Sequence, residues 1–186
     1  MAAAEHSAQQ RRRPPGASEV RPRVLSVNSA PKKGMRKTPV AGGAALIKDR
    51  GVAGDAHAGD WHRQVSLLAI ESIDKMRAAG LDVGPGDFAE NLTVEDVDLL
   101  SWPIGTRFKV GAAELELSQI GKICHTHCAI YRQAGDCIMP TEGVFAVVRR
   151  AAPVKAGDAV TLIELGGGYC DRVPADDPMG EKGFLS

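Results

Sequence analysis

Short apolar runs, separated by polar or glycine-containing turns, recur along the central part of this sequence. One of them, 113–117, alternates polar and apolar residues, which is typical of a half-buried antiparallel strand. The alternating helices of a doubly wound parallel fold are missing, and so is a Walker-type or GxGxxG loop. The pattern predicts a mainly β protein, a closed or nearly closed β-barrel with a few short helices. The expected strands lie at 24–27, 45–47, 65–68, 107–111, 113–117, 144–148 and 159–163.

One amphipathic helix is predicted directly after the run at 65–68. Ile70, Ile73, Met76 and Leu81 fall on one face at helical spacing, which indicates packing against a core. Gly80 is suited to end this helix, because glycine readily adopts the left-handed conformation of a helix C-terminus.

The 186 residues fit a single domain with a tail at each end. Residues 1–22 are rich in Ala, Arg and Pro and lack a hydrophobic period, so we expect a disordered tail. The folded domain is expected over 23–165. Residues 166–186 begin with three glycines, and a flexible tail is expected there, with Cys170 exposed and without a role.

Charge and hydropathy exclude several classes of protein. The 23 basic and 23 acidic residues balance, so the strong basic excess of a nucleic-acid-binding protein is missing. The arginine run 11–13 is interpreted as part of a solvated tail. No apolar run approaches the roughly 20 residues that span a bilayer, and no signal peptide is evident. We therefore expect a cytoplasmic protein that binds neither nucleic acid nor membrane, with reduced cysteines.

The first segment with candidate site residues is the polar stretch 54–64, which lies between two expected strands. His57 can bind a metal or transfer protons near neutral pH. Arg63 can hold a phosphate through its planar guanidinium. The alternative is that these side chains only stabilise turns, since a loop histidine needs no special role.

The second segment, 86–93, places acidic and amide groups just before a strand. Glu90 and Asn91 offer hydrogen-bond acceptors and donors to a polar ligand at one end of the sheet. The alternative is a turn in which Asp87 and Asn91 bond to their own backbone.

The third segment, 120–128, follows an expected strand and contains two cysteines, Cys124 and Cys128. Lys122 and a protonated His125 can lower the pKa of the Cys124 thiol, and the resulting thiolate can attack sulfur or bind a soft metal. Two alternatives stay open. The cysteines and histidines of this segment can form a structural zinc site with Cys137, or the thiols can be inert packing groups.

Taken together, four stretches of the chain resemble the MOSC family, named for the C-terminal domain of molybdenum-cofactor sulfurase. They occur in the family's order, and the resemblance extends from roughly Val24 to Glu164, about three quarters of the chain. Many relatives have an arginine followed by Pro-Cys where this chain has Lys122-Ile123-Cys124, so the active thiol stays open between Cys124 and Cys128. The stretches are GDAHAGDWHRQVSLLA, GDFAENLTVEDVDL, IGKICHTHCAIYRQAGDCIMPTEGVFAVV and VKAGDAVTL.

The resemblance implies a molybdopterin-type molybdenum cofactor and a cysteine, best matched by Cys124, that ligates molybdenum or carries a persulfide. Implied partners are a cysteine desulfurase or other sulfur donor, and a molybdoenzyme or electron donor. Two other functions stay open: a molybdenum-dependent reductase of N-hydroxylated compounds, and a non-enzymatic cofactor-delivery module with a structural zinc. The residues expected around the cofactor are His57, Arg63, Glu90, Asn91, Lys122 and His125.

Overall fold

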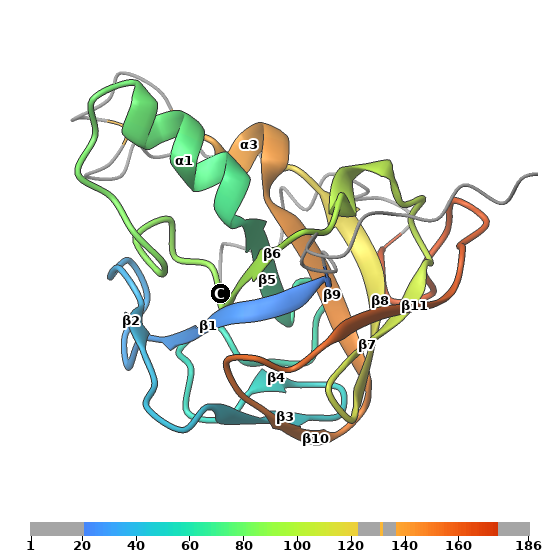
Figure 1. Ribbon diagram of the computed structural model, residues 1–186. Coiled ribbons are helices and arrows are strands. Elements are labelled where there is room, and N and C mark those ends of the chain that lie inside the picture. Colours follow the sequence, from blue (N-terminus) through green and yellow to red (C-terminus); the bar gives the residue numbers. More distant parts are fainter. Residues whose placement is uncertain (1–20, 123–130, 132–136, 175–186) are drawn as a thin grey trace, which may run out of the picture.

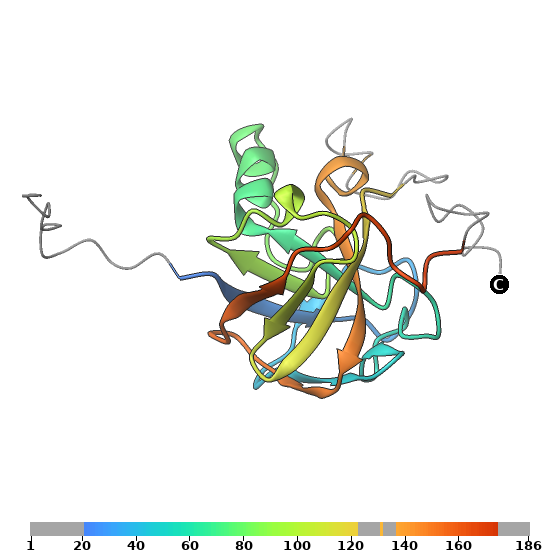
Figure 2. The ribbon, with the colours of Figure 1, turned by 90° about the vertical axis from the view of Figure 1, so that its right-hand side faces the viewer.

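The computed structural model describes residues 21–122, 131 and 137–174, which form two β-sheets and two α-helices (Figures 1 and 2). The larger sheet has eight strands in the order β11-β7-β8-β9-β5-β6-β1-β2, and the smaller has three in the order β10-β3-β4. The elements are β1 Arg23–Ser29, β2 Thr38–Pro39, β3 Ala44–Ile47, β4 Gly51–Val52, β5 Val65–Ala69, α1 Ile70–Ala78, β6 Leu92–Glu95, η1 Leu99–Ser101, β7 Arg107–Val110, β8 Ala113–Ile120, α3 Met139–Glu142, β9 Val144–Arg150, β10 Ala152–Val154 and β11 Val160–Glu164.

The mainly β prediction is confirmed, and each predicted strand is present. In β8 the side chains of Ala113, Leu115 and Leu117 are fully buried while the residues between them are half-buried, which is the expected period of two. Four strands were not among the expected ranges: β2, β4 and β10, which have only two or three residues, and β6, which has four. Such short segments carry no periodic signal.

The predicted closure of the strands into a barrel is not confirmed. The ladder of the larger sheet ends at β11 on one side and at the short β2 on the other. Between β1 and the start of β11 there is one isolated bridge, Arg23 to Ala159, with backbone hydrogen bonds from Val24 to Asp158 and from Val160 to Pro22. This contact brings the two ends of the sheet together but does not continue as a strand pair.

The predicted helix is present as α1, which connects the parallel strands β5 and β6 and covers the end of the sheet (Figure 1). Ile73 is fully buried, and Ile70, Met76 and Leu81 pack against the same apolar cluster. Gly80 has φ +93°, the left-handed conformation expected where the helix ends. In the described part of the chain, no helix is long and apolar enough to cross a membrane.

The expectation that Cys170 is exposed is wrong. The backbone amide of Gly166 donates to the Thr106 hydroxyl at 3.0 Å, and that of Gly168 donates to the Ile104 carbonyl at 2.9 Å. These bonds hold the chain against the sheet after β11, and the Cys170 side chain packs inward with 1% exposure. Burial raises the pKa of this thiol to about 11. Glycine content alone did not predict this packing.

Candidate functional site

A buried ion pair between Lys37 and Asp55 lies where the first two candidate segments meet. The Lys37 ammonium is 3.1 Å from Asp55 Oδ1, and both side chains are at most 2% exposed. Lys37 follows β1, and its backbone amide donates to the Gly86 carbonyl of the second segment at 2.9 Å. Asp55 belongs to the first segment, so the pair connects the two.

Asp55 is held in its charged form. Burial alone would raise the pKa of this carboxyl, but hydrogen bonding from His57 and the charge of Lys37 outweigh burial and lower it. Its Oδ2 also accepts a bond from the Ala30 amide at 3.1 Å. Burial lowers the pKa of the Lys37 ammonium, while Asp55 and then Glu90 oppose this effect and Lys122 adds to it. Lys37, Glu90 and Lys122 are therefore close enough to interact electrostatically.

His57, a predicted site residue, lies beside this pair. Its backbone amide donates to Asp55 Oδ1 at 3.0 Å, and its ring Nδ1 is 3.5 Å from the same oxygen. The Trp61 indole donates to the His57 carbonyl at 3.0 Å. The side chain is 22% exposed, so the imidazole is fixed at its backbone while its ring reaches the surface.

Glu90 and Asn91, also predicted site residues, are buried within the fold. Glu90 Oε1 accepts bonds from the Gly86 amide at 2.5 Å and from the Thr93 hydroxyl at 2.7 Å, and burial raises its pKa. Asn91 Oδ1 accepts from the Ser66 amide at 3.2 Å. This contact with strand β5 differs from the alternative interpretation, a turn in which the Asn91 side chain bonds to its own backbone. Both residues hold the second segment in place, and contact with a cofactor stays a prediction for them.

His62, next to Arg63 in the sequence, connects the first segment to the start of the third. The Arg63 side chain is buried and its guanidinium carbon lies 4.8 Å from the centre of the Trp61 ring. His62 Nε2 is 2.9 Å from Gln119 Oε1, and Gln119 Nε2 donates to the Gly121 carbonyl at 2.7 Å. These bonds run directly to the end of β8, where the third segment begins.

Only the first three residues of the third segment, 120–122, lie within the described residues. Gly121 donates from its amide to the Gly143 carbonyl at 2.7 Å, and the Lys122 amide donates to the Pro140 carbonyl at 3.3 Å. Lys122 is half-buried, and Cys137 packs against the apolar cluster under α1. The predicted residues Cys124, His125 and Cys128 lie outside the described residues, so their predicted roles are not tested.

Within the described residues, the acidic and cysteine side chains that approach one another closely enough to hold a metal are Glu116, Cys170 and Asp171. Arg149 lies between them, with Nε 2.8 Å from Glu116 and a second ion pair to Asp171. Its guanidinium already neutralises both carboxylates. This cluster is an ion-pair network and is separate from the zinc set predicted in the third segment.

The structure thus brings the first two segments and the start of the third together. It adds Lys37 and Gln119, which the sequence did not single out, and gives buried contacts to Asp55 and His62 of the first segment. Lys37 lies in a lysine- and arginine-rich stretch that resembles any solvated loop. Nothing in that stretch distinguishes the one buried lysine. Asp55 and His62 lie within the predicted first segment, but their buried contacts depend on residues distant in the sequence.

Fold and site together define a β-sheet protein with a cluster of buried charges, in which the cysteine-containing segment begins at the end of β8. The family model described as the MOSC domain matches residues 54–161, more than half of the chain. The chain therefore belongs to the MOSC family. No curated protein matches the sequence closely enough to count as a relative.

Solved structures share the fold at low sequence identity. YiiM from Geobacillus stearothermophilus is similar with a TM-score of 0.62 and 21% identity, over 80% of this chain and 78% of YiiM. The YUAD protein from Bacillus subtilis has a TM-score of 0.63 and 19% identity, over 76% of this chain and 94% of its own. YiiM from Escherichia coli has a TM-score of 0.58 and 21% identity, over 77% and 70% of the two chains.

Proposed function

We propose that the chain binds a molybdopterin-type molybdenum cofactor and handles sulfur through Cys124. The observation that carries this proposal is the set of contacts that join the segments: Lys37 pairs with Asp55 and bonds to the Gly86 carbonyl. His62 reaches Gly121, next to Lys122, through Gln119. Membership of the MOSC family supports the same chemistry.

The described residues fit the polar character of such a cofactor. A phosphate requires cations, and Lys122 is a half-buried cation at the end of β8. One buried polar atom of the second segment, Glu90 Oε2, has no hydrogen-bond partner among the described residues. Buried polar atoms in native proteins nearly always have a partner, so this atom is a candidate for a contact with a ligand.

Each residue is assigned a role from its position. Lys122 binds the phosphate, while His57, with its ring near the surface, makes a polar contact. Asp55, itself held by Lys37, fixes the backbone of His57. Glu90, Asn91 and Arg63 hold the surrounding segments from buried positions. When bound, the cofactor supplies a molybdenum centre that a thiolate or persulfide can ligate.

Sulfur transfer to the chain requires no external oxidant. The Cys124 thiolate attacks the outer sulfur of a donor persulfide and forms a new sulfur–sulfur bond. The donor's own sulfur–sulfur bond breaks, and the donor thiolate leaves with the electron pair and takes a proton. Cys124 then carries the persulfide. A neighbouring cation such as Lys122 favours the attacking thiolate.

Native mass spectrometry of the full chain tests this proposal. After incubation with a low-molecular-mass persulfide, the wild type should gain a sulfur-sized mass that reductant removes. Cys124→Ser should lose this gain but keep the ability to bind cofactor. Cys137→Ser is the matched control, because Cys137 packs against the apolar cluster under α1, and should behave as the wild type.

Other outcomes contradict parts of the proposal. Full sulfur uptake by Cys124→Ser together with loss in Cys128→Ser would move the thiol role to Cys128. A tightly held zinc, with neither a molybdopterin-sized adduct nor sulfur uptake, would favour a delivery module with a structural metal.

A further inference from the structure

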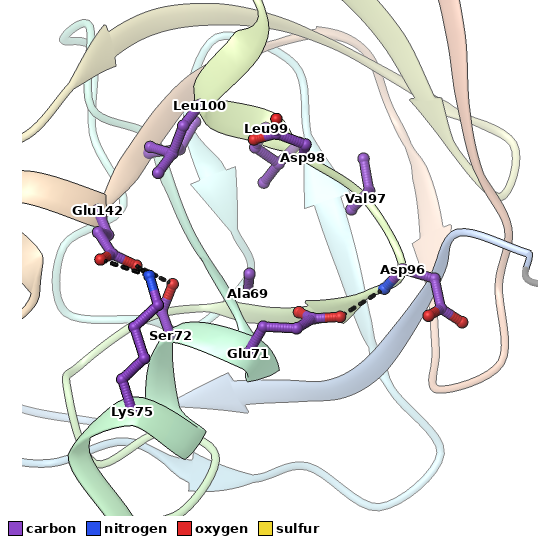
Figure 3. A pocket seen from close by; sticks show the side chains of 11 residues that line it. Ala69, Glu71, Ser72, Lys75, Asp96, Val97, Asp98, Leu99, Leu100 and Glu142 are labelled. Carbon is purple, nitrogen blue, oxygen red and sulfur yellow. Dashed lines mark hydrogen bonds and ion pairs between the residues drawn. The ribbon is translucent and has the colours of Figure 1, made fainter. Parts of the chain in front are cut away.

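A second candidate site lies at the C-terminal ends of the parallel strands β5 and β6, where a cavity of about 280 Å³ opens between α1, η1 and α3 (Figure 3). Its apolar wall can accommodate the methylene stem of a long side chain. The apolar lining residues are Ala69, Val97, Leu99, Leu100 and Val144.

The polar residues of this pocket are mainly acidic. Its lining contains one cation, Lys75, and four acidic residues, Glu71, Asp96, Asp98 and Glu142. Glu142 already pairs with Lys75 at 2.8 Å, and Glu71 Oε1 accepts the Asp96 backbone amide at 2.9 Å (Figure 3). Among the described residues, no cation forms an ion pair with the carboxylate of Asp96 or Asp98. The pocket therefore has an excess of negative charge and suits a cation with an apolar stem.

The N-terminal part of this chain joins the fold at the rim of the pocket. Strands β1 and β6 are antiparallel with Arg23 opposite Glu95, so β1 begins where β6 ends (Figure 2). Arg23 Nε donates to Glu95 Oε1 at 2.6 Å and also interacts with the charge of Asp96, the next residue and part of the pocket. Whatever precedes Arg21 in the sequence is thus tethered beside these carboxylates.

We propose that the pocket binds the arginine run 11–13 of this chain. Arginine combines a permanent positive charge with an apolar stem, which matches a pocket with an apolar wall and unpaired carboxylates. The eight steps along the chain from Arg13 to Arg21 reach at most about 28 Å when extended, enough to return to the pocket rim. A short tether gives an effective concentration on the order of millimolar, so even a weak site is partly occupied.

Hydrogen exchange of the full chain, followed by mass spectrometry at low ionic strength, tests this contact. The variant Arg11→Gln/Arg12→Gln/Arg13→Gln should exchange about two- to fivefold faster than the wild type at 96–100, because a contact held at millimolar effective concentration is only partly occupied. In about 0.5 M salt the wild type should approach the variant, because screening weakens exposed ion pairs. The control neutralises three exposed lysines elsewhere, Lys32, Lys48 and Lys109, and should change nothing at 96–100.

A second pair of variants identifies the partner of the arginines. In an Asp96→Asn/Asp98→Asn background, neutralising the arginine run should have no further effect on exchange at 96–100. Asparagine tolerates the positive φ of 60° at Asp96, so the backbone can be kept. Equal exchange in the wild type and the triple arginine variant would overturn the proposal. An arginine effect that persists in the asparagine background would overturn it as well, since the run would then bind elsewhere.

Discussion

The buried pair of Lys37 and Asp55 predicts a large loss of stability when one charge is removed. Asp55→Asn keeps the size of the side chain and one oxygen for the Ala30 or His57 amide. It also leaves the Lys37 ammonium, whose side chain is 1% exposed, without its ion-pair partner. A buried charge without a partner is costly, so the folded state should be destabilised rather than merely rearranged.

The expected loss is about 3–5 kcal/mol in the free energy of unfolding, the range found when one member of a buried pair is removed. That is a large fraction of the roughly 5–15 kcal/mol that stabilises a typical domain. Asp74→Asn is the matched control. Asp74 pairs with Arg77 at 2.8 Å, but both side chains are about half exposed. An exposed pair is worth about 0–1 kcal/mol, so this control should be nearly neutral.

Urea denaturation at pH 7, followed by tryptophan fluorescence, measures both variants. Asp55 has a folded-state pKa below its ordinary value of 3.8, so its contribution is present above that pH and is lost as the pH falls toward the folded-state pKa. The difference between wild type and Asp55→Asn should therefore shrink in acid. A loss at pH 7 below about 1 kcal/mol, or one equal to that of Asp74→Asn, would refute the role of a buried pair.

Three further predictions concern other described residues. Burial raises the folded-state pKa of Glu90, so this group destabilises the wild type as the pH rises above 4.5, its ordinary value, and Glu90→Gln should flatten that part of a urea-midpoint profile against pH. Gly121→Ala should lower the free energy of unfolding by at least about 2 kcal/mol in urea titration, because φ is +74° and the new Cβ would lie 2.4 Å from the Pro140 carbonyl oxygen; Gly54→Ala, with φ +76° and open space, should cost only about 1 kcal/mol. Cys170, with its pKa raised to about 11, should react with iodoacetamide at pH 8 at least about tenfold more slowly in the folded chain than in urea, and equal rates by mass spectrometry would contradict its burial.

The strands and α1 were predictable because their signal is local. Burial on one face imposes a period of two on β8, and the apolar face of α1 repeats at helical spacing. The continuity of the sheet was not predictable in the same way. Whether the ladder closes depends on how β1 and β11 approach each other, and neighbouring residues contain no information about that distance.

The same difference between local signals and contacts of distant residues applies to the candidate site. His57, Glu90 and Asn91 stand out because polar groups cluster in loops that follow or precede strands. The buried partner of Asp55 does not stand out, since Lys37 is recognised only when residues far apart in sequence meet. The local composition also gave a wrong prediction for Cys170. Three glycines before it indicated an exposed tail, but the thiol is buried against the sheet.

The residues that flank the cysteine-containing stretch, 121–122 before it and 140–143 after it, meet at the same place on the sheet. The bonds from Gly121 to Gly143 and from Lys122 to Pro140 close the chain there, independently of what lies between. Closing a longer loop costs only about 0.6 kcal/mol for each doubling of its length. Lengthening the chain between Lys122 and Cys137 should therefore cost little free energy of folding, so the same framework can hold segments of different length at this end of the sheet.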